Sequence, residues 1–165
     1  MQGHETTHFL NPRAKRVTKP LGDLGRLQHF ELHLITLPVG SVASEFHRQV
    51  YAKESVDILA GNGTVRMGPD MFEIEVGDFI AYPPDDGAHD IRNTVPSPMT
   101  CIVVEQRLDF DVVYYPRKIN VSIAMPETPG ILSILPLSAA QFCQMRVGKD
   151  CKSQFLWGKF FGRNI

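Results

Sequence analysis

Hydrophobic and polar side chains alternate over short stretches in the middle of the sequence, and turn-forming residues separate these stretches. The clearest stretch is 30–37, which is followed by the turn-forming sequence 38–40. Comparable stretches cover 56–60, 64–67, 72–76, 79–82 and 99–105. A period of two, with turn signals every ~8–12 residues, is typical of an all-β sandwich or barrel. No helical period appears between residues 26 and 107, so we expect the barrel to occupy residues 26–107.

The two ends of the chain have a different character. Residues 1–25 are polar and interrupted by proline and glycine, which predicts an N-terminal arm whose His4 and His8 are exposed to solvent. Residues 108–165 are predicted to be a C-terminal extension that packs on the barrel. Within the extension, Ser138 and the glutamine three residues later have the spacing of a capping box, which predicts one short helix at about 139–147.

Composition and charge narrow the range of partners. The chain has 165 residues, and 17 basic side chains nearly cancel 18 acidic ones, so nothing favours nucleic acid or an anionic membrane surface as a partner. No apolar run is long enough to span a bilayer, and the first residues lack a hydrophobic signal core. The three cysteines are an odd number without metal-like spacing, which favours reduced thiols. We therefore expect a cytoplasmic protein whose partner is a small molecule.

Two groups of polar residues are candidates for chemistry. His47 and Gln49 lie two residues apart, so an extended backbone would direct both side chains to one face of a sheet, and Glu54 begins the next stretch. His89 follows a proline-rich turn and begins another strand. Two imidazoles, a carboxylate and an amide oxygen that converge in a barrel would form a site for a divalent transition metal. His33 is a further candidate for lining the pocket, because it lies in the clearest strand.

The spacing of these residues resembles the two motifs of the cupin superfamily. The first motif corresponds to Gly40, His47-Arg48-Gln49, Glu54 and Gly61, and the second to Gly77, Pro84, His89 and Asn93. The resemblance covers about residues 26–107 and implies a double-stranded β-helix, the jelly-roll barrel of cupins. It also implies metal ligands at His47, Glu54 and His89.

Gln49 departs from the cupin pattern, which has a second histidine at this position. An amide oxygen is a neutral, harder and weaker ligand than imidazole, so it would shift the preference of the site away from copper and zinc and toward manganese or iron. The expected cofactor is a divalent transition metal, with manganese, iron, zinc and nickel all left open.

Three functions remain open at this point. The resemblance implies a metal-binding small-molecule enzyme, for which a sugar or sugar-phosphate isomerase is one model, an iron-dependent dioxygenase, or a binding protein without turnover. An isomerase of phosphorylated sugars needs Arg or Lys at the pocket mouth. We also expect a homodimer, because small cupins usually pair and because residues 112–115 and an aromatic tail at 155–161 add apolar side chains outside the barrel.

Overall fold

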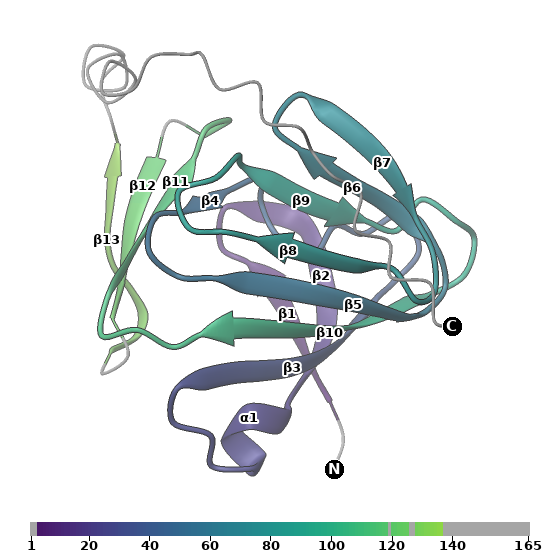
Figure 1. Ribbon diagram of the computed structural model, residues 1–165. Helices are drawn as coiled ribbons and strands as arrows, with labels where there is room; N and C mark the ends of the chain where they lie inside the picture. Colours follow the sequence, from purple (N-terminus) through teal and green to yellow (C-terminus); the bar gives the residue numbers. More distant parts are fainter. Residues whose placement is uncertain (1–2, 119, 126–127, 137–165) are drawn as a thin grey trace.

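The computed structural model describes residues 3–118, 120–125 and 128–136, with side chains for residues 3–118 (Figure 1). The strands are β1 (His4–His8), β2 (Asn11–Pro20), β3 (Phe30–Leu37), β4 (Arg48–Gln49), β5 (Glu54–Ala60), β6 (Gly63–Met67), β7 (Asp70–Ile74), β8 (Phe79–Tyr82), β9 (His89–Arg92), β10 (Met99–Gln106), β11 (Asp111–Tyr115), β12 (Asn120–Met125) and β13 (Thr128–Pro136). The described part has one helix, α1 (Leu21–Leu24). The helix predicted at about 139–147 lies outside the described residues. No helix in the described part is long and apolar enough to cross a membrane.

The strands form three antiparallel sheets. A six-stranded sheet has the order β1-β2-β3-β10-β5-β8, a three-stranded sheet the order β7-β6-β9, and a four-stranded sheet the order β13-β12-β11-β4. In Figure 1 the three-stranded sheet lies above β8 and β5, while the four-stranded sheet stands at one end of both. The predicted all-β fold and jelly-roll barrel are confirmed.

The apolar core fills one end of the barrel. Leu37 of β3 lies directly opposite Met99 of β10, and neither side chain has exposed surface. The other buried core residues are Ile35, Val56, Ile58, Val65, Ile74, Ile80, Tyr82, Ile91 and Cys101. Burial raises the pKa of the Cys101 thiol to about 12, so this cysteine is an inert apolar side chain, as its position in an apolar strand suggests.

The turn between β5 and β6 needs both of its glycines. Gly61 has a φ of +78°, and a Cβ at this position would lie 2.7 Å from the carbonyl oxygen of Pro98. A Cβ at Gly63 would lie 2.3 Å from the carbonyl oxygen of Arg92. Only a residue without a side chain allows the backbone to pass this close. The glycine of the first motif therefore has a structural reason.

The predicted N-terminal arm contains two strands that extend the six-stranded sheet. β1 and β2 form a hairpin, and β2 pairs with β3, so that Thr18 lies opposite Ile35. Ala14 and Thr18 are buried on the inner face, whereas Lys15 between them is exposed. The alternation in β2 is hard to recognise in the sequence because its inward residues are small or polar.

The chain after the barrel returns to it through β11. Val113 of β11 lies opposite Gln49 of β4, and both side chains are buried. Tyr115 is buried as well. Part of the apolar surplus expected at a subunit interface is thus used within the chain, and β11 lies directly beside the candidate metal ligands.

Candidate metal centre

The inner face of the barrel changes from apolar to polar along the same strands. Beyond the core residues, the inward positions are His33 and then Glu31 on β3, Val103 and then Glu105 on β10, and Glu54 on β5. Glu105 lies opposite both Glu31 and Glu54 in the strand register. Three carboxyl groups therefore meet at one end of the barrel, whereas the opposite end is packed with aliphatic side chains.

His47, Glu54 and His89 converge at this polar end. Each offers a ligand atom, and these atoms all lie within 4.8 Å of one another. Nε2 of His89 is 3.6 Å from Oε2 of Glu54. The two histidines are held together by their backbones, since the His47 amide donates to the His89 carbonyl at 3.1 Å and the His89 amide donates to the His47 carbonyl at 2.8 Å.

The surroundings of His47 leave one ring nitrogen for a ligand. Nδ1 lies 2.9 Å from the carbonyl oxygen of Glu45, which can only accept, so we assign the ring proton to Nδ1 and the lone pair to Nε2. Burial and the neighbouring His89 lower the pKa of His47 to about 4. The imidazole is therefore neutral at pH 7, which is the form that binds a metal ion.

His89 shows that the group fits a metal ion. Both of its ring nitrogens are buried and have no hydrogen-bond partner among the described residues. The ring is held in place by stacking on Tyr82, with centroids 3.6 Å apart and planes 8° apart. A buried imidazole without partners is costly, and an ion bound between His89 and Glu54 would remove that cost.

Glu54 supplies the negative charge of the group. Burial raises the pKa of its carboxyl, but His89, His47 and Arg16 lower it, and the net pKa lies below the ordinary value. Glu54 is thus a carboxylate at neutral pH. Two imidazoles and one carboxylate, with positions left for water or substrate, are suited to a divalent transition metal.

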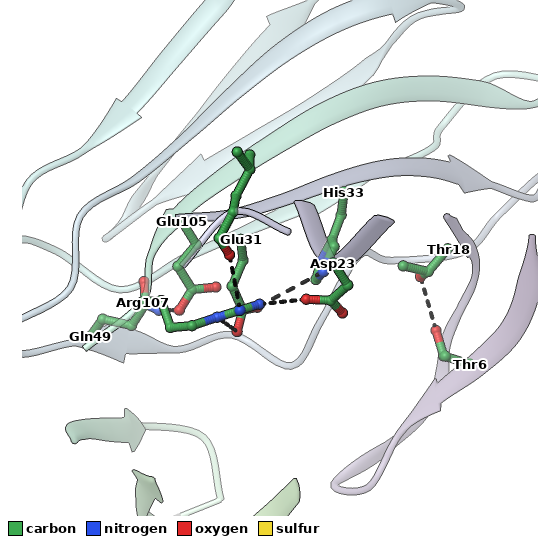
Figure 2. Close-up of polar contacts among 9 residues, drawn as sticks. Thr6, Thr18, Asp23, Glu31, His33, Gln49, Glu105 and Arg107 are labelled. Atoms are coloured by element: carbon green, nitrogen blue, oxygen red, sulfur yellow. Dashed lines mark hydrogen bonds and ion pairs between the residues drawn. The ribbon is translucent and has the colours of Figure 1, made fainter. Parts of the chain in front are cut away.

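Gln49 lies nearby but makes a different contact. Its side-chain nitrogen donates a hydrogen bond to Oε1 of Glu105, as Figure 2 shows. The structure therefore commits the NH2 group of Gln49 to Glu105, and a role for its oxygen as a metal ligand stays a prediction.

Glu105 is the residue that the sequence analysis missed. Burial, together with the nearby Glu54 and Glu31, raises the pKa of its carboxyl to about 8, although the hydrogen bond from Gln49 lowers it. At pH 7 this side chain is mostly protonated. The sequence does carry one signal for Glu105. It is an acidic residue in an otherwise apolar strand, and its spacing of two from Val103 and four from Cys101 puts it on the same face as these residues.

Two histidines lie around this centre. His33 is half-buried on the inner face of β3, with Nε2 3.9 Å from Glu31, and its contact with a ligand stays a prediction. His8 was expected to be exposed, and this prediction is wrong. Its ring packs 5.6 Å from Tyr115, and burial, with help from Arg16, lowers its pKa to about 4. The polar, proline-interrupted sequence of residues 1–25 carries no local sign that the tip of the hairpin packs beside the barrel.

Comparison with known proteins agrees with this architecture. Residues 33–105 match the family described as the cupin domain. A candidate sugar phosphate isomerase from Acidithiobacillus ferrooxidans ATCC 23270 is 38% identical, with a TM-score of 0.78 over 82% of this chain and 85% of that chain. This chain belongs to the cupin superfamily.

Two further cupin structures extend the comparison. A sugar phosphate isomerase of the cupin superfamily from Silicibacter pomeroyi DSS-3 is 25% identical, with a TM-score of 0.72 over 85% of this chain and 92% of that chain. A predicted oxalate decarboxylase from Thermotoga maritima is 21% identical, with a TM-score of 0.51 over 57% of this chain and 82% of that chain, and it shares the fold alone. No curated protein sequence matches this cupin.

Proposed function

We propose that this cupin is a metal-dependent isomerase of sugar phosphates. The observation that carries the proposal is the group of His47, Glu54 and His89 beside a carboxyl group, Glu105, that retains its proton at neutral pH. The naming of two similar structures as sugar phosphate isomerases supports the choice of substrate class.

Interconversion of an aldose and a ketose moves hydrogen between two neighbouring carbons and their oxygens, with no net gain or loss of atoms. A group must therefore accept a proton and return one, and the developing oxyanion must be stabilised. A bound divalent metal would supply a Lewis acid that polarises the substrate carbonyl. His47, Glu54 and His89 are the residues that would hold it.

Glu105 is placed to hold the mobile proton. Its Oε1 accepts from the amide of Gln49, so the carboxyl proton lies on Oε2. A carboxyl group with a pKa of about 8 can donate and recover a proton near neutral pH. Gln49 keeps the group oriented. In this proposal the ionised fraction of Glu105 accepts the proton from one substrate carbon and returns it to the neighbouring carbon, and Gln49 holds the carboxyl group in position.

The ligand set also favours a second candidate. Two histidines and one carboxylate on one side of a metal, with open positions opposite, are the arrangement of non-haem iron oxygenases. His47, His89 and Glu54 offer the same atoms. An iron-dependent dioxygenase is therefore the alternative, and a binding protein without turnover is what remains if neither reaction occurs.

The test is to load the metal-free protein separately with Mn²⁺, Fe²⁺, Zn²⁺ and Ni²⁺ and to incubate it with aldose phosphates in D2O. Isomerase activity predicts deuterium at the carbon next to the carbonyl, detected by NMR, and both the exchange and the product vanish in His47→Ala. Glu105→Gln should bind metal normally but lose most of the exchange, because it cannot exchange a carboxyl proton. Oxygen consumption by the iron form without deuterium exchange would replace the isomerase with the dioxygenase.

A homodimer in the cytoplasm is also part of the proposal. The outer face of the six-stranded sheet bears the exposed side chains of Phe30, Leu59 and Phe79. A hollow of 540 Å³ lies on this face, with Phe30, Ala81 and Val104 among its lining residues. Pairing of two such faces would cover these apolar groups. Light scattering at micromolar concentration should give twice the mass of one chain, and Phe79→Glu should give the mass of one.

A further inference from the structure

The N-terminal hairpin brings a basic side chain to the inner face of the barrel. In β2, Ala14 and Thr18 are buried on the inner face, and Thr18 lies opposite the fully buried Ile35. Arg16 stands between them at the same parity of the strand, so its side chain leaves the same face. Thr6 of β1 fixes this part of the hairpin, because its hydroxyl lies 3.3 Å from that of Thr18 (Figure 2).

Arg16 is only partly used by the protein itself. One nitrogen of its guanidinium, Nη1, donates to the carbonyl oxygen of Ala43 at 3.0 Å. Among the side chains of residues 3–118, no carboxylate oxygen lies within 4.0 Å of the guanidinium. A guanidinium has five N–H donors in a planar fork, so most of the donors of Arg16 are left for another acceptor.

The charge of Arg16 acts on the candidate metal centre. It lowers the pKa of Glu54, and it also contributes to the lowered pKa values of His8 and His33. These residues come from three separate strands that surround the polar end. Ala43, whose carbonyl accepts from Arg16, donates in turn to the carbonyl of Ile91 at 2.8 Å, and Ile91 lies two residues after His89 on β9, so the guanidinium lies on the side of the barrel that carries the two histidines.

The other charged groups at this end are already compensated or neutral. Arg107 contacts both Asp23, at 2.7 Å, and Glu31, at 3.5 Å (Figure 2). The histidines around Arg16 are uncharged at pH 7 and can donate hydrogen bonds. The positive charge of Arg16 is left for an anion.

We propose that Arg16 forms an anion subsite at the mouth of the barrel and binds the phosphate group of the substrate. The inference rests on the proposed function for the identity of the substrate, but the anion subsite itself rests on the geometry of the hairpin. Arg16 lies outside the region 33–105 that matches the cupin domain. The hairpin thus adds substrate selection to a barrel whose metal ligands lie within that region.

The probe for this subsite is inorganic phosphate, titrated calorimetrically into the full-length protein with and without Mn²⁺. The metal-free arm separates binding by Arg16 from binding by the metal. Arg16→Gln should weaken phosphate binding about ten-fold or more in both arms, because a charge-assisted contact is lost. The phosphate affinity of Arg16→Lys should lie between those of wild type and Arg16→Gln, because an ammonium group keeps the positive charge but lacks the planar set of N–H donors of a guanidinium. Arg13→Gln, on the exposed face of the same strand, is the matched control and should bind like wild type.

Phosphate affinity in Arg16→Gln within about two-fold of wild type in both arms would overturn the subsite. Circular dichroism and metal content check that the variant is folded, and if it is not, Arg16→Lys decides by the same measurement. A weakened affinity for phosphate without any isomerase activity in wild type would retain the subsite and reject the proposed reaction. Isomerase activity in wild type with unchanged phosphate affinity in Arg16→Gln would retain the proposed reaction and reject the subsite. Comparison of D-ribose 5-phosphate with D-ribose then shows whether the phosphate carries the affinity, and only the phosphorylated sugar should respond to Arg16→Gln.

Discussion

The two ends of the barrel are built from the same strands but with opposite chemistry. At the apolar end, Leu37, Ile58 and Met99 fill the space between the sheets and leave almost no exposed surface. At the polar end, Glu54 and Glu105 face each other, and the nitrogens of His89 lack partners among the described residues. Burial of such polar groups costs free energy, whereas burial of aliphatic groups supplies it. One end therefore stabilises the fold, and the other is free to hold groups that a bound ligand completes.

The largest effect should come from removing a ligand at the polar end. His47→Ala leaves one imidazole and one carboxylate, and we expect metal affinity to fall by more than about 100-fold, beyond the usual cost of disturbing residues around a metal site. The free energy of unfolding of the metal-free protein should change little. Elemental analysis after dialysis measures the metal, and the exposed His29 provides the control variant His29→Ala. Stoichiometric metal in His47→Ala would place the ion elsewhere.

Shortening a side chain at the apolar end should lower the free energy of unfolding but leave metal binding unchanged. Ile58 is 1% exposed, so Ile58→Ala removes buried methylene groups and leaves a cavity, at a cost of about 2–5 kcal/mol in the free energy of unfolding. Metal stoichiometry should stay that of wild type under native conditions. Urea denaturation measures the cost, and Met71→Ala, at an exposed position of β7, should lie within about 0.5 kcal/mol of wild type. Loss of metal from folded Ile58→Ala would show that the two ends are not independent.

A change of ligand type should tune the polar end rather than destroy it. Gln49→His offers an imidazole where the chain has an amide, so affinity for zinc, nickel or copper should rise relative to manganese by on the order of 10–100-fold. Competition titrations of the metal-free protein with a chromophoric chelator measure the ratio. Metal binding by Gln49→His together with none by wild type would identify a vestigial centre. An unchanged ratio of affinities would show that the side chain at position 49 does not reach the metal.

A further difference between the two ends concerns the proton on Glu105. Its pKa rises from 4.5 to about 8 on folding, so between these pH values the folded state binds a proton that the unfolded state has released. The contribution of Glu105 to the free energy of unfolding of wild type is therefore present at low pH and is lost as the pH rises toward 8. Glu105→Gln removes the titration, so its stability relative to metal-free wild type should increase from pH 5 to pH 8.5.

Urea denaturation of both metal-free proteins at the two pH values gives this difference. The lowered pKa values of His8 and His47 make stability rise with pH between about 4 and 6.5, but they do so in both proteins and cancel. A difference that is constant with pH would show that Glu105 has an ordinary pKa in the folded protein.

The sequence by itself determined the all-β class and the identity of the three residues that could hold a metal. Alternation with a period of two is visible in single strands, and the motif spacing of His47, Glu54 and His89 needs no knowledge of distant pairing. The turn at Gly61 could also be predicted from the sequence, because a tight turn between two strands depends on the residues at the turn itself.

The tertiary structure decided the surroundings of that centre. Glu105 is an unremarkable acid in the sequence, and only its register against Glu54 and Glu31 buries it and raises its pKa. Arg16 and His8 lie in a segment that resembles a solvated arm, and only the β1–β2 hairpin and its pairing with β3 place them against the barrel. Register between distant strands depends on the whole set of packed side chains rather than on local pattern. For this reason the residues of the candidate metal centre could be named from the sequence, whereas the proposed proton carrier and the proposed anion subsite could not.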